Sequence, residues 1–408
     1  MLVASPHGAA YHSANGRSEE DWAIHLGRRR PIHSSNAAEA ATAIRLIGVT
    51  KHFGAAEAPA VDELSLEIRE GEIVALVGPS GCGKTTTLKM INRLVTPTSG
   101  TIEVLGEDQM AVAAHDLRRR IGYVIQQIGL FPHHTVERNI AAVPELLGWD
   151  DDRIDERCAE LADLVGLERE LLERYPSALS GGQQQRAGVA RALAADPPIL
   201  LMDEPYSAVD PIVRERLQDD LLELQSAVHK TIVIVTHDID EAIKLADRVA
   251  IMNVGGILEQ YATPDELLGD PTSEFVASFL GRERGLRRLA LRTVADVETI
   301  DGPAVTPESS LTDARDVMRR FGTTWVAVVE DGRLHGWVDR RAVERAEVAA
   351  VGELPTTPFV SSVSPTTPLR EALDVIVNAH SRIAVVVDQD GRYTGMITID
   401  EVAESLEP

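Results

Sequence analysis

The clearest chemical pattern in the sequence is a glycine-rich stretch that follows five apolar residues. Ile73 to Val77 is typical of a strand buried on both faces, and the residues after it fit the pattern G-x-x-x-x-G-K-[ST]. Glycines let backbone N–H groups converge on phosphate oxygens, while Lys84 can reach the terminal phosphates and Thr85 can bind Mg²⁺. We therefore predict a nucleoside triphosphate site formed by Gly78, Pro79, Ser80, Gly81, Cys82, Gly83, Lys84, Thr85 and Thr86.

A second predicted strand, Ile199 to Met202, is followed by two carboxylates, Asp203 and Glu204. Many parallel strands end in Asp, so this pattern alone indicates little. A nucleotide site, however, needs an acidic group that holds hydrated Mg²⁺ and a base that orients water. We expect Asp203 to take the first role and Glu204 the second.

The residues Ser180, Gly181, Gly182 and Gln183 open a further predicted helix. A hydroxyl, flexible backbone donors and a helix dipole would suit a phosphate group at this terminus. A simple capping turn explains Ser180 equally well. The segment by itself therefore leaves both interpretations open.

Taken together, these motifs resemble those of ATP-binding cassette ATPases over about residues 43–282. The resemblance implies that Ser180 to Gln183 of one subunit close over the ATP held by a second copy. It also implies that Gln126 touches Mg²⁺ and the attacking water and faces the membrane partner, with Gln127 as a rival for that role. In this interpretation the metal ligands are Thr85, Gln126 and Asp203.

The same resemblance gives expected roles to three more residues. Asp210 lies in the segment Ser207 to Asp210, which matches the loop that crosses the dimer interface. His237 matches the histidine that contacts the γ-phosphate. Phe53 stands where the family stacks an aromatic ring on adenine, although a core role for it remains open.

The thiol of Cys82 has two interpretations. A lysine neighbour and a helix N-terminus lower a thiol pKa, which would make Cys82 sensitive to oxidation. Alternatively, Cys82 is a small residue that fits the loop, which is the interpretation we favour.

The elements that must position these residues alternate between strands and helices. Helical patterns cover roughly 137–175 and 182–195, and buried strands are predicted at Ile199 to Met202 and Thr231 to Val235. This alternation favours an α/β fold with a largely parallel sheet and a helical subdomain, as in a P-loop cassette ATPase. The segments Ile44 to Val49 and Leu64 to Ile68 alternate in the manner of edge strands.

The remainder of the chain contains an internal repeat. Leu311 to Met318 aligns with Leu369 to Ile376, and both copies continue with a buried strand and an Asp-Gly-Arg turn. The repeat resembles a tandem pair of cystathionine-β-synthase (CBS) domains with an α+β fold. In that family a Thr or Ser followed three residues later by Asp holds ribose; Thr398 and Glu401 match in part, whereas the first copy has Asp339 and Ala342. An adenine nucleotide site and a purely structural or dimerising role both stay open.

The sequence thus predicts four segments. They are a disordered extension at 1–42, the cassette at 43–282, a basic linker at 283–293 and the repeats at 294–408, divided into about 294–346 and 350–408. At this junction, residues 282–292 carry Arg282, Arg284, Arg287, Arg288 and Arg292 against Glu283 alone.

A cassette followed by such a pair resembles the ATPase subunits of importers for glycine betaine, choline or carnitine. This resemblance implies ATP and Mg²⁺ as ligands, and as partners a second copy of the chain, membrane permeases and, indirectly, a substrate-binding protein. A cassette for a different small solute, or a cassette ATPase that is not coupled to transport, remains an alternative.

Composition limits the compartment and the partners. The chain has 64 Asp and Glu against 40 Lys and Arg, a net charge of −24, which disfavours nucleic acid as a partner. No apolar stretch approaches the roughly 18 residues of a membrane helix. The two cysteines fit no disulfide framework. We expect a peripheral protein on the cytoplasmic face of a membrane.

Overall fold

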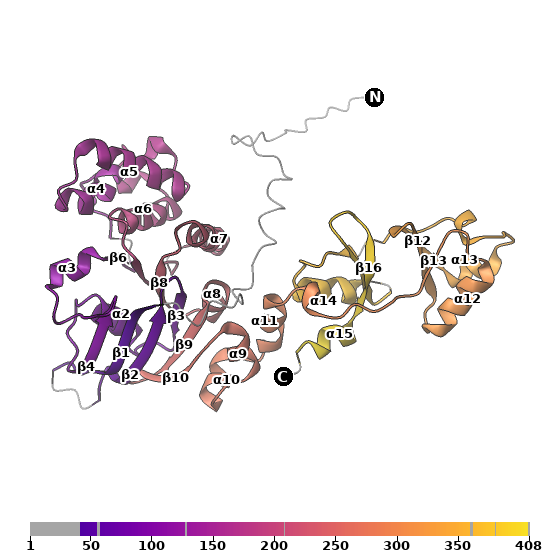
Figure 1. Ribbon diagram of the computed structural model, residues 1–408, viewed down its shortest axis with the longest axis horizontal. Helices are drawn as coiled ribbons and strands as arrows, with labels where there is room; N and C mark the ends of the chain where they lie inside the picture. Colours follow the sequence, from indigo (N-terminus) through magenta and orange to yellow (C-terminus); the bar gives the residue numbers. More distant parts are fainter. Residues whose placement is uncertain are drawn as a thin grey trace, which may run out of the picture. The chain divides into compact units, whose positions relative to one another are not determined.

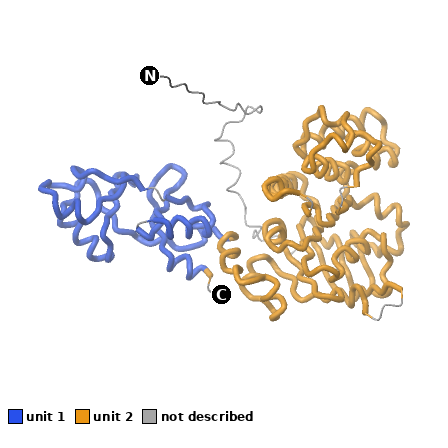
Figure 2. The backbone as a smooth tube through the Cα atoms, turned by 180° about the vertical axis from the view of Figure 1, so that it is seen from behind, with its two compact units in different colours: residues 1–39, 292–405 blue, residues 40–291, 406–408 orange. Residues whose placement is uncertain are grey.

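The computed structural model describes residues 41–54, 58–126, 129–207, 209–359, 362–379 and 381–406. The described residues form two units, which Figure 2 colours separately. One unit extends to Leu291 and also includes Leu406, and the other comprises Arg292 to Ser405. The predicted extension at 1–42 lies outside the described residues except for Ala41 and Thr42, and Thr42 begins the first strand.

The first unit is built around a mostly parallel sheet in the order β10-β9-β3-β8-β7-β6. All residues of β3, β7 and β8 are buried, as expected for apolar strands covered on both faces. Only β10 runs antiparallel to its neighbour. The strands are β3 (Ile73–Val77), β6 (Ile121–Val124), β7 (Ile199–Asp203), β8 (Thr231–Thr236), β9 (Arg248–Asn253) and β10 (Ile257–Ala262).

A second sheet in this unit is antiparallel, in the order β2-β1-β4-β5. Its strands are β1 (Thr42–Lys51), β2 (Val61–Arg69), β4 (Ser99–Val104) and β5 (Glu107–Asp108). The expectation that both early segments are edge strands is wrong for β1, which pairs with β2 on one side and β4 on the other. Alternating burial reports one exposed face of a strand and does not report an unpaired edge.

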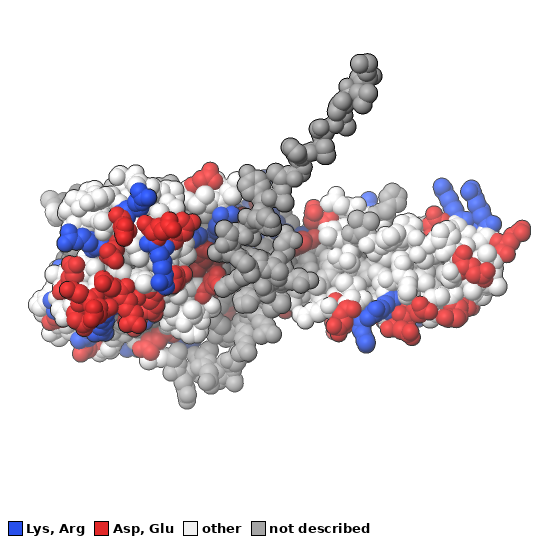
Figure 3. All heavy atoms as spheres, turned by 90° about the horizontal axis from the view of Figure 1, so that it is seen from above, with Lys and Arg blue, Asp and Glu red and all other residues white. Residues whose placement is uncertain are grey.

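Helices α4, α5 and α6 form a separate helical layer beside the sheets (Figure 1). They bury Ile140, Leu161 and Ala187 in a common core. Figure 3 views the unit from the side of these helices and shows a dense group of acidic side chains there. The helices of the unit are α2 (Lys84–Ile91), α3 (Ala114–Arg119), α4 (Val136–Leu146), α5 (Asp151–Leu164), α6 (Gly181–Leu193), α7 (Pro211–Val228), α8 (Ile239–Leu245), α9 (Pro264–Gly269), α10 (Glu274–Leu280) and α11 (Arg284–Leu291), with 3₁₀ turns at Arg169–Leu171 and Pro176–Ala178.

The segment proposed as a basic linker is not a row of free cations. Most of it forms α11, which packs against α9 and buries Leu289. Arg287 pairs with Asp240, and Arg288 pairs with Asp265. The sequence could not reveal this because the acidic partners lie far away along the chain.

The second unit contains two copies of one motif, which confirms the predicted duplication. The first copy orders its sheet β11-β12-β13 and the second β14-β15-β16. In the first hairpin Asp331 and Gly332 both have positive φ, as the Asp-Gly signal predicts. The elements are β11 (Ala304–Val305), α12 (Leu311–Arg320), β12 (Trp325–Glu330), β13 (Arg333–Asp339), α13 (Arg340–Arg345), β14 (Ser362–Val363), α14 (Leu369–Asn378), β15 (Ile383–Val387), β16 (Tyr393–Thr398) and α15 (Ile399–Glu404), with 3₁₀ turns at Val294–Asp296 and Val351–Glu353.

The two copies share an apolar core. Trp325 and Ala327 of the first copy pack with Val385 and Met396 of the second, and Trp325 also meets Phe359 edge to face. One copy alone would leave this surface exposed, which supports the expectation that the two copies fold together. The predicted fold class, an α/β unit with a helical layer followed by an α+β pair, is confirmed. In the described part of the chain, no helix has both the length and the apolar character needed to cross a membrane.

Candidate functional site

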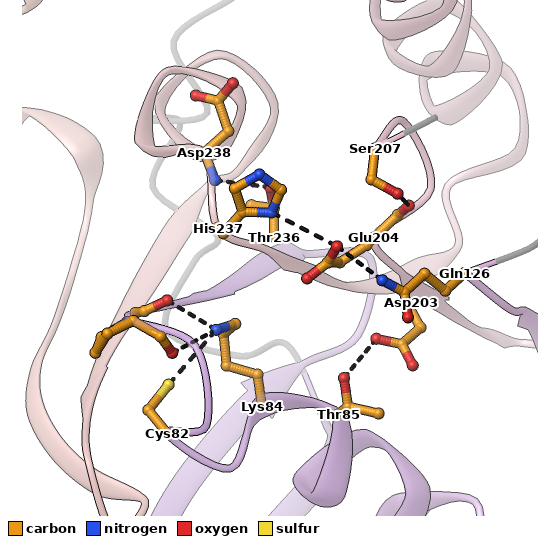
Figure 4. Close-up of polar contacts among 12 residues, drawn as sticks. Cys82, Lys84, Thr85, Gln126, Asp203, Glu204, Ser207, Thr236, His237 and Asp238 are labelled. Atoms are coloured by element: carbon orange, nitrogen blue, oxygen red, sulfur yellow. Dashed lines mark hydrogen bonds and ion pairs between the residues drawn. The ribbon is translucent and has the colours of Figure 1, made fainter. Parts of the chain in front are cut away.

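The predicted site residues gather at one end of the parallel sheet (Figure 4). The loop Gly78–Gly83 follows β3, Asp203 ends β7, and His237 follows β8. Gln126 comes two residues after the end of β6. Because neighbouring parallel strands end at the same edge of the sheet, side chains that are far apart in sequence meet there.

Two glycines of the phosphate loop cannot be replaced without strain. Gly78 has φ of 154°, and a Cβ on it would lie 2.1 Å from the carbonyl oxygen of Met252. Gly83, at φ 93°, precedes α2, and its Cβ would lie 2.5 Å from the carbonyl oxygen of Ala60. The loop therefore has the tight curvature that a phosphate cradle requires. The first N–H groups of α2 also lack acceptors within the helix, as at any helix start.

Lys84 lies inside the curve of this loop. Its side chain is buried, and its Nζ donates to the carbonyl oxygens of Gly78 at 2.7 Å and Pro79 at 3.0 Å. A phosphate that enters the loop would meet this ammonium group directly.

Cys82 is packed within the same loop. Its side chain is fully buried, with its Sγ 3.6 Å from the Nζ of Lys84. A Cβ on Gly78 would lie 2.8 Å from this sulfur, so the space around it is filled. A buried thiol is shielded from oxidants, which favours the interpretation that Cys82 is a small residue that fits.

Thr85 and Asp203 form the second part of the site. The hydroxyl of Thr85 donates to Oδ1 of Asp203 at 2.8 Å. Burial raises the pKa of Asp203, while the Thr85 hydroxyl and the positive charge of Lys89 oppose that rise. Tyr123 on β6 lies close by, and burial followed by the charge of Asp203 raises the pKa of its hydroxyl.

Glu204 is held in an unusual backbone conformation. Its φ is 46°, in the left-handed region that non-glycine residues rarely adopt. Its N–H donates to the carbonyl of Val235 at 2.9 Å, which continues the β7–β8 pairing beyond β7. Strain of this kind costs on the order of 1 kcal/mol and is concentrated at functional sites.

The Glu204 carboxylate is the meeting point of three loops. Its Oε2 accepts from Nε2 of Gln126 at 3.0 Å and lies 3.5 Å from Nδ1 of His237 (Figure 4). Gln127, the alternative to Gln126, lies outside the described residues. The imidazole of His237 is 62% exposed, so it can contact a ligand bound at this end of the sheet.

Other predicted residues lie outside this group. The Ser207 hydroxyl donates to the carbonyl of Glu204 at 3.0 Å, whereas Asp210 caps α7 by accepting from the N–H of Ile212. Phe53 is 49% exposed with Nζ of Lys51 5.1 Å above its ring, so the alternative core role is wrong.

The Ser180 segment is separate from the phosphate loop. Ser180 caps α6 in a reciprocal capping box with Gln183, and Gly181 and Gly182 form the first turn. In Figure 1, α6 lies with α4 and α5, away from α2. The local geometry thus matches the capping interpretation. Within one chain, Ser180 lies apart from Lys84 and the phosphate loop.

Sequence reasoning missed a charged group behind the site. Arg214 on α7 donates to the carbonyl of Val209 at 3.2 Å and to Asp238, the N-cap of α8, at 3.5 Å. Glu241, in the first turn of α8, is 5% exposed, and its Oε1 has no hydrogen-bond partner among the described residues. Burial, followed by the charge of Asp238, raises the pKa of Glu241 to about 7, although the Thr236 hydroxyl and Arg214 oppose this rise. A signal was available, because Glu241 follows Asp238 by three residues at a helix start.

The donors fit a magnesium nucleotide. Thr85, Asp203 and Gln126 offer oxygen ligands, the type that Mg²⁺ prefers. No group of three His, Cys, Asp or Glu in the described ranges could hold a metal ion by itself. That arrangement suits Mg²⁺, which is usually bound by one or two protein groups together with phosphates and water.

Comparisons with known proteins identify both units. Residues 61–207 match the ABC transporter family, and residues 294–348 and 351–408 each match the CBS domain. The chain is similar to the osmoprotectant import ATP-binding protein OsmV of Salmonella typhimurium, with 48% identity over 89% of this chain and 96% of the relative. It is also similar to the choline transport ATP-binding protein OpuBA of Bacillus subtilis, with 46% identity over 85% of this chain and 93% of the relative. Among solved structures, cbiO1 from Clostridium perfringens, part of the ABC transporter complex cbiONQ, aligns with 25% identity and a TM-score of 0.54 over 62% of this chain and 96% of that one.

The buried carboxyl of Glu241 makes a prediction about stability and pH. Its pKa rises from 4.5 to about 7 on folding, so between these values the folded chain binds a proton that the unfolded chain has lost. The contribution of Glu241 to the free energy of unfolding is therefore greatest at low pH, and it falls by up to about 3 kcal/mol as pH rises through this range. The difference in stability between Glu241→Gln and wild type should therefore grow in favour of the variant as pH rises from 4.5 to 7. Above pH 7 this difference should stay constant.

This is measured by urea unfolding across the pH range. The matched control is Glu215→Gln, which changes an exposed carboxyl on α7. A Glu241→Gln difference that stays constant between pH 4.5 and 7 would contradict the prediction.

Proposed function

The chain belongs to the family of ABC importer ATP-binding proteins that carry CBS domains, and we propose that it hydrolyses ATP to drive uptake of a quaternary amine osmoprotectant. The substrate class comes from the relatives, whose names specify osmoprotectant or choline import. The observation that carries the ATPase proposal is the meeting of Gln126, Glu204 and His237 beside the Lys84 loop. Substrate contacts would be made by other subunits.

In this mechanism each side chain has one task. Lys84 binds the terminal phosphates, since its ammonium group already faces the inside of the loop. Glu204 accepts a hydrogen bond from a water molecule and orients it, while Gln126 fixes the carboxylate from the other side. His237 donates to the γ-phosphate from its exposed position. Thr85, Asp203 and Gln126 would hold Mg²⁺, which would supply positive charge that offsets the negative charge of the phosphates.

We propose that two copies form the complete site. Ser180 is exposed at the start of α6, and the nearby start of α7 exposes Ile212 to 78%. Gly182 and Val213 bring these two helix starts together, since a Cβ on Gly182 would lie 3.1 Å from Val213. A second copy that covers this apolar surface would bring the partner's phosphate loop to Ser180.

The remaining partners follow from the family. We propose that membrane permeases bind near Gln126 and that a substrate-binding protein delivers the solute to them. The chain would then lie on the cytoplasmic face of the membrane, where ATP is available.

Replacement of Glu204, the proposed base, separates ATP binding from ATP turnover. Glu204→Gln should bind ATP normally and lose hydrolysis by about a hundredfold or more, because the amide cannot act as a base for water. Nucleotide binding is measured by fluorescence titration and turnover by phosphate release, with Glu215→Gln as control. Near-normal hydrolysis in Glu204→Gln would remove Glu204 from this role.

Mixing two inactive variants tests the composite site. Lys84→Ala and Ser180→Arg should each be inactive, but a mixed dimer contains one site with both native groups. An equal mixture should therefore recover about a quarter of wild-type ATPase activity. A mixture of Lys84→Ala with Glu204→Gln damages both sites and should recover none. Equal activity in the two mixtures would contradict the two-copy site.

We also propose that the second repeat binds an adenine nucleotide for regulation. In support, Thr398 caps α15, and its N–H and hydroxyl both donate to Glu401, at 2.8 and 2.5 Å. The same position in the first repeat is occupied by Asp339, which caps α13 through the N–H of Ala342. A ribose could exchange hydrogen bonds with Glu401, whereas the first repeat offers no equivalent acceptor.

Calorimetry on the full chain tests this second site. Lys84→Ala removes the main ATP site, and this variant should still bind one AMP or ATP per chain. Adding Glu401→Ala should weaken that binding by about tenfold, because a charged hydrogen bond to ribose is lost. Adding Glu404→Ala, on the same helix, should leave the binding unchanged. Lack of nucleotide binding by Lys84→Ala would leave the repeats a structural or dimerising module.

A further inference from the structure

The start of α8 carries an unusual concentration of negative charge directly after His237. Asp238 is its N-cap, and Asp240 and Glu241 lie in its first turn. Asp238 accepts from the N–H groups of Asp240 at 2.9 Å and Glu241 at 3.3 Å. Neighbouring carboxylates such as Asp238 and Asp240 repel one another, and cations that lie against them offset this repulsion.

Two arginines approach this acidic turn from different helices. Arg214 reaches Asp238 from α7. Arg287 reaches Asp240 from α11, with Nε 2.5 Å from Oδ1 and a terminal nitrogen 3.1 Å from Oδ2. The second pair is bidentate, the stronger and more directional form of an arginine–carboxylate bond.

Arg287 is itself fixed in place. Its side chain is only 19% exposed, and its remaining terminal nitrogen donates to the carbonyl of Leu280 at 2.5 Å, at the end of α10. The bond to Asp240 is the main cause that raises the pKa of Arg287, and Asp238 contributes as well. One guanidinium thus joins α8, α10 and α11 within the same unit.

His237 depends on the position of this turn. It is the single residue between Thr236, which ends β8, and Asp238, which caps α8. The N–H of Asp238 donates to the Thr236 hydroxyl at 3.0 Å, so strand and helix start are joined closely. A small shift of the α8 start would therefore move His237 away from Glu204, 3.5 Å distant.

We propose that Arg287 is a positioning residue for His237, acting through Asp240 and the first turn of α8. This inference rests on the proposed role of His237 in hydrolysis. The chain continues from Leu291 of α11 into the unit that contains the repeats.

The test measures steady-state ATP hydrolysis by the full chain. Arg287→Gln and Asp240→Asn should each lower kcat about three- to tenfold and change KM for ATP less than twofold, since nucleotide binding does not depend on the turn. The charge-reversed pair Arg287→Asp with Asp240→Arg should recover much of the lost kcat. Arg284→Gln, an exposed arginine of the same helix, should match wild type.

A second comparison distinguishes positioning from general destabilisation. In the His237→Ala background, Arg287→Gln should cause no further loss of kcat, because the residue that it positions is absent. An additive loss there, or equal rates for Arg287→Gln and Arg284→Gln in the native background, would overturn the inference. If instead His237→Ala alone hydrolyses ATP at the wild-type rate, the proposed role of His237 fails, and this inference fails with it.

Discussion

The parallel pairing of β3, β8, β7 and β6 is the constraint on which the site depends. Val77 pairs with Thr236, and Asp203 pairs with Val235, so the strand ends differ by about one residue. This register places the phosphate loop, the carboxylates and His237 at one edge. A slip of one strand by one residue would turn each of its buried side chains to the opposite face of the sheet. Because these strands are apolar on both faces, such a slip would require the helices on both faces to repack.

The strained Glu204 shows how that constraint is used. A left-handed residue directly after a buried strand turns the chain sharply, and the bond from its N–H to Val235 keeps the backbone attached to the sheet. The side chain can therefore project toward Gln126 and His237. The stability of the surrounding sheet offsets the local strain, which is the usual condition for such a conformation to persist.

The sequence was enough to find the residues that the structure gathers at the sheet edge where those residues form contiguous motifs. The loop Gly78–Thr85 and the pair Asp203–Glu204 are contiguous motifs, so their residue types fix their surroundings. Prediction failed where the partner is distant: β1 gains a second neighbour strand, and Arg287 gains Asp240 across 47 positions. Glu241 was missed for the same reason, since its burial depends on the packing of α8 against the sheet. The spacing of Glu241 from Asp238 indicates a helix start, but composition and spacing carry no information about which residues pack against that helix.

Net charge alone was also a poor guide to the arginines of α11. In a chain with a charge of −24, a basic stretch differs in sign from most of the sequence around it. Because carboxylates are in excess, however, a partly buried arginine can readily form an ion pair. Arg287 and Arg288 both do so, and their side chains are 19% and 12% exposed. Such pairs are directional as well as attractive, because a planar guanidinium accepts few orientations of a carboxylate. Arg287 and Arg288 thus fix α11 on α8 and α9. The charge of the basic stretch therefore positions helices within this unit.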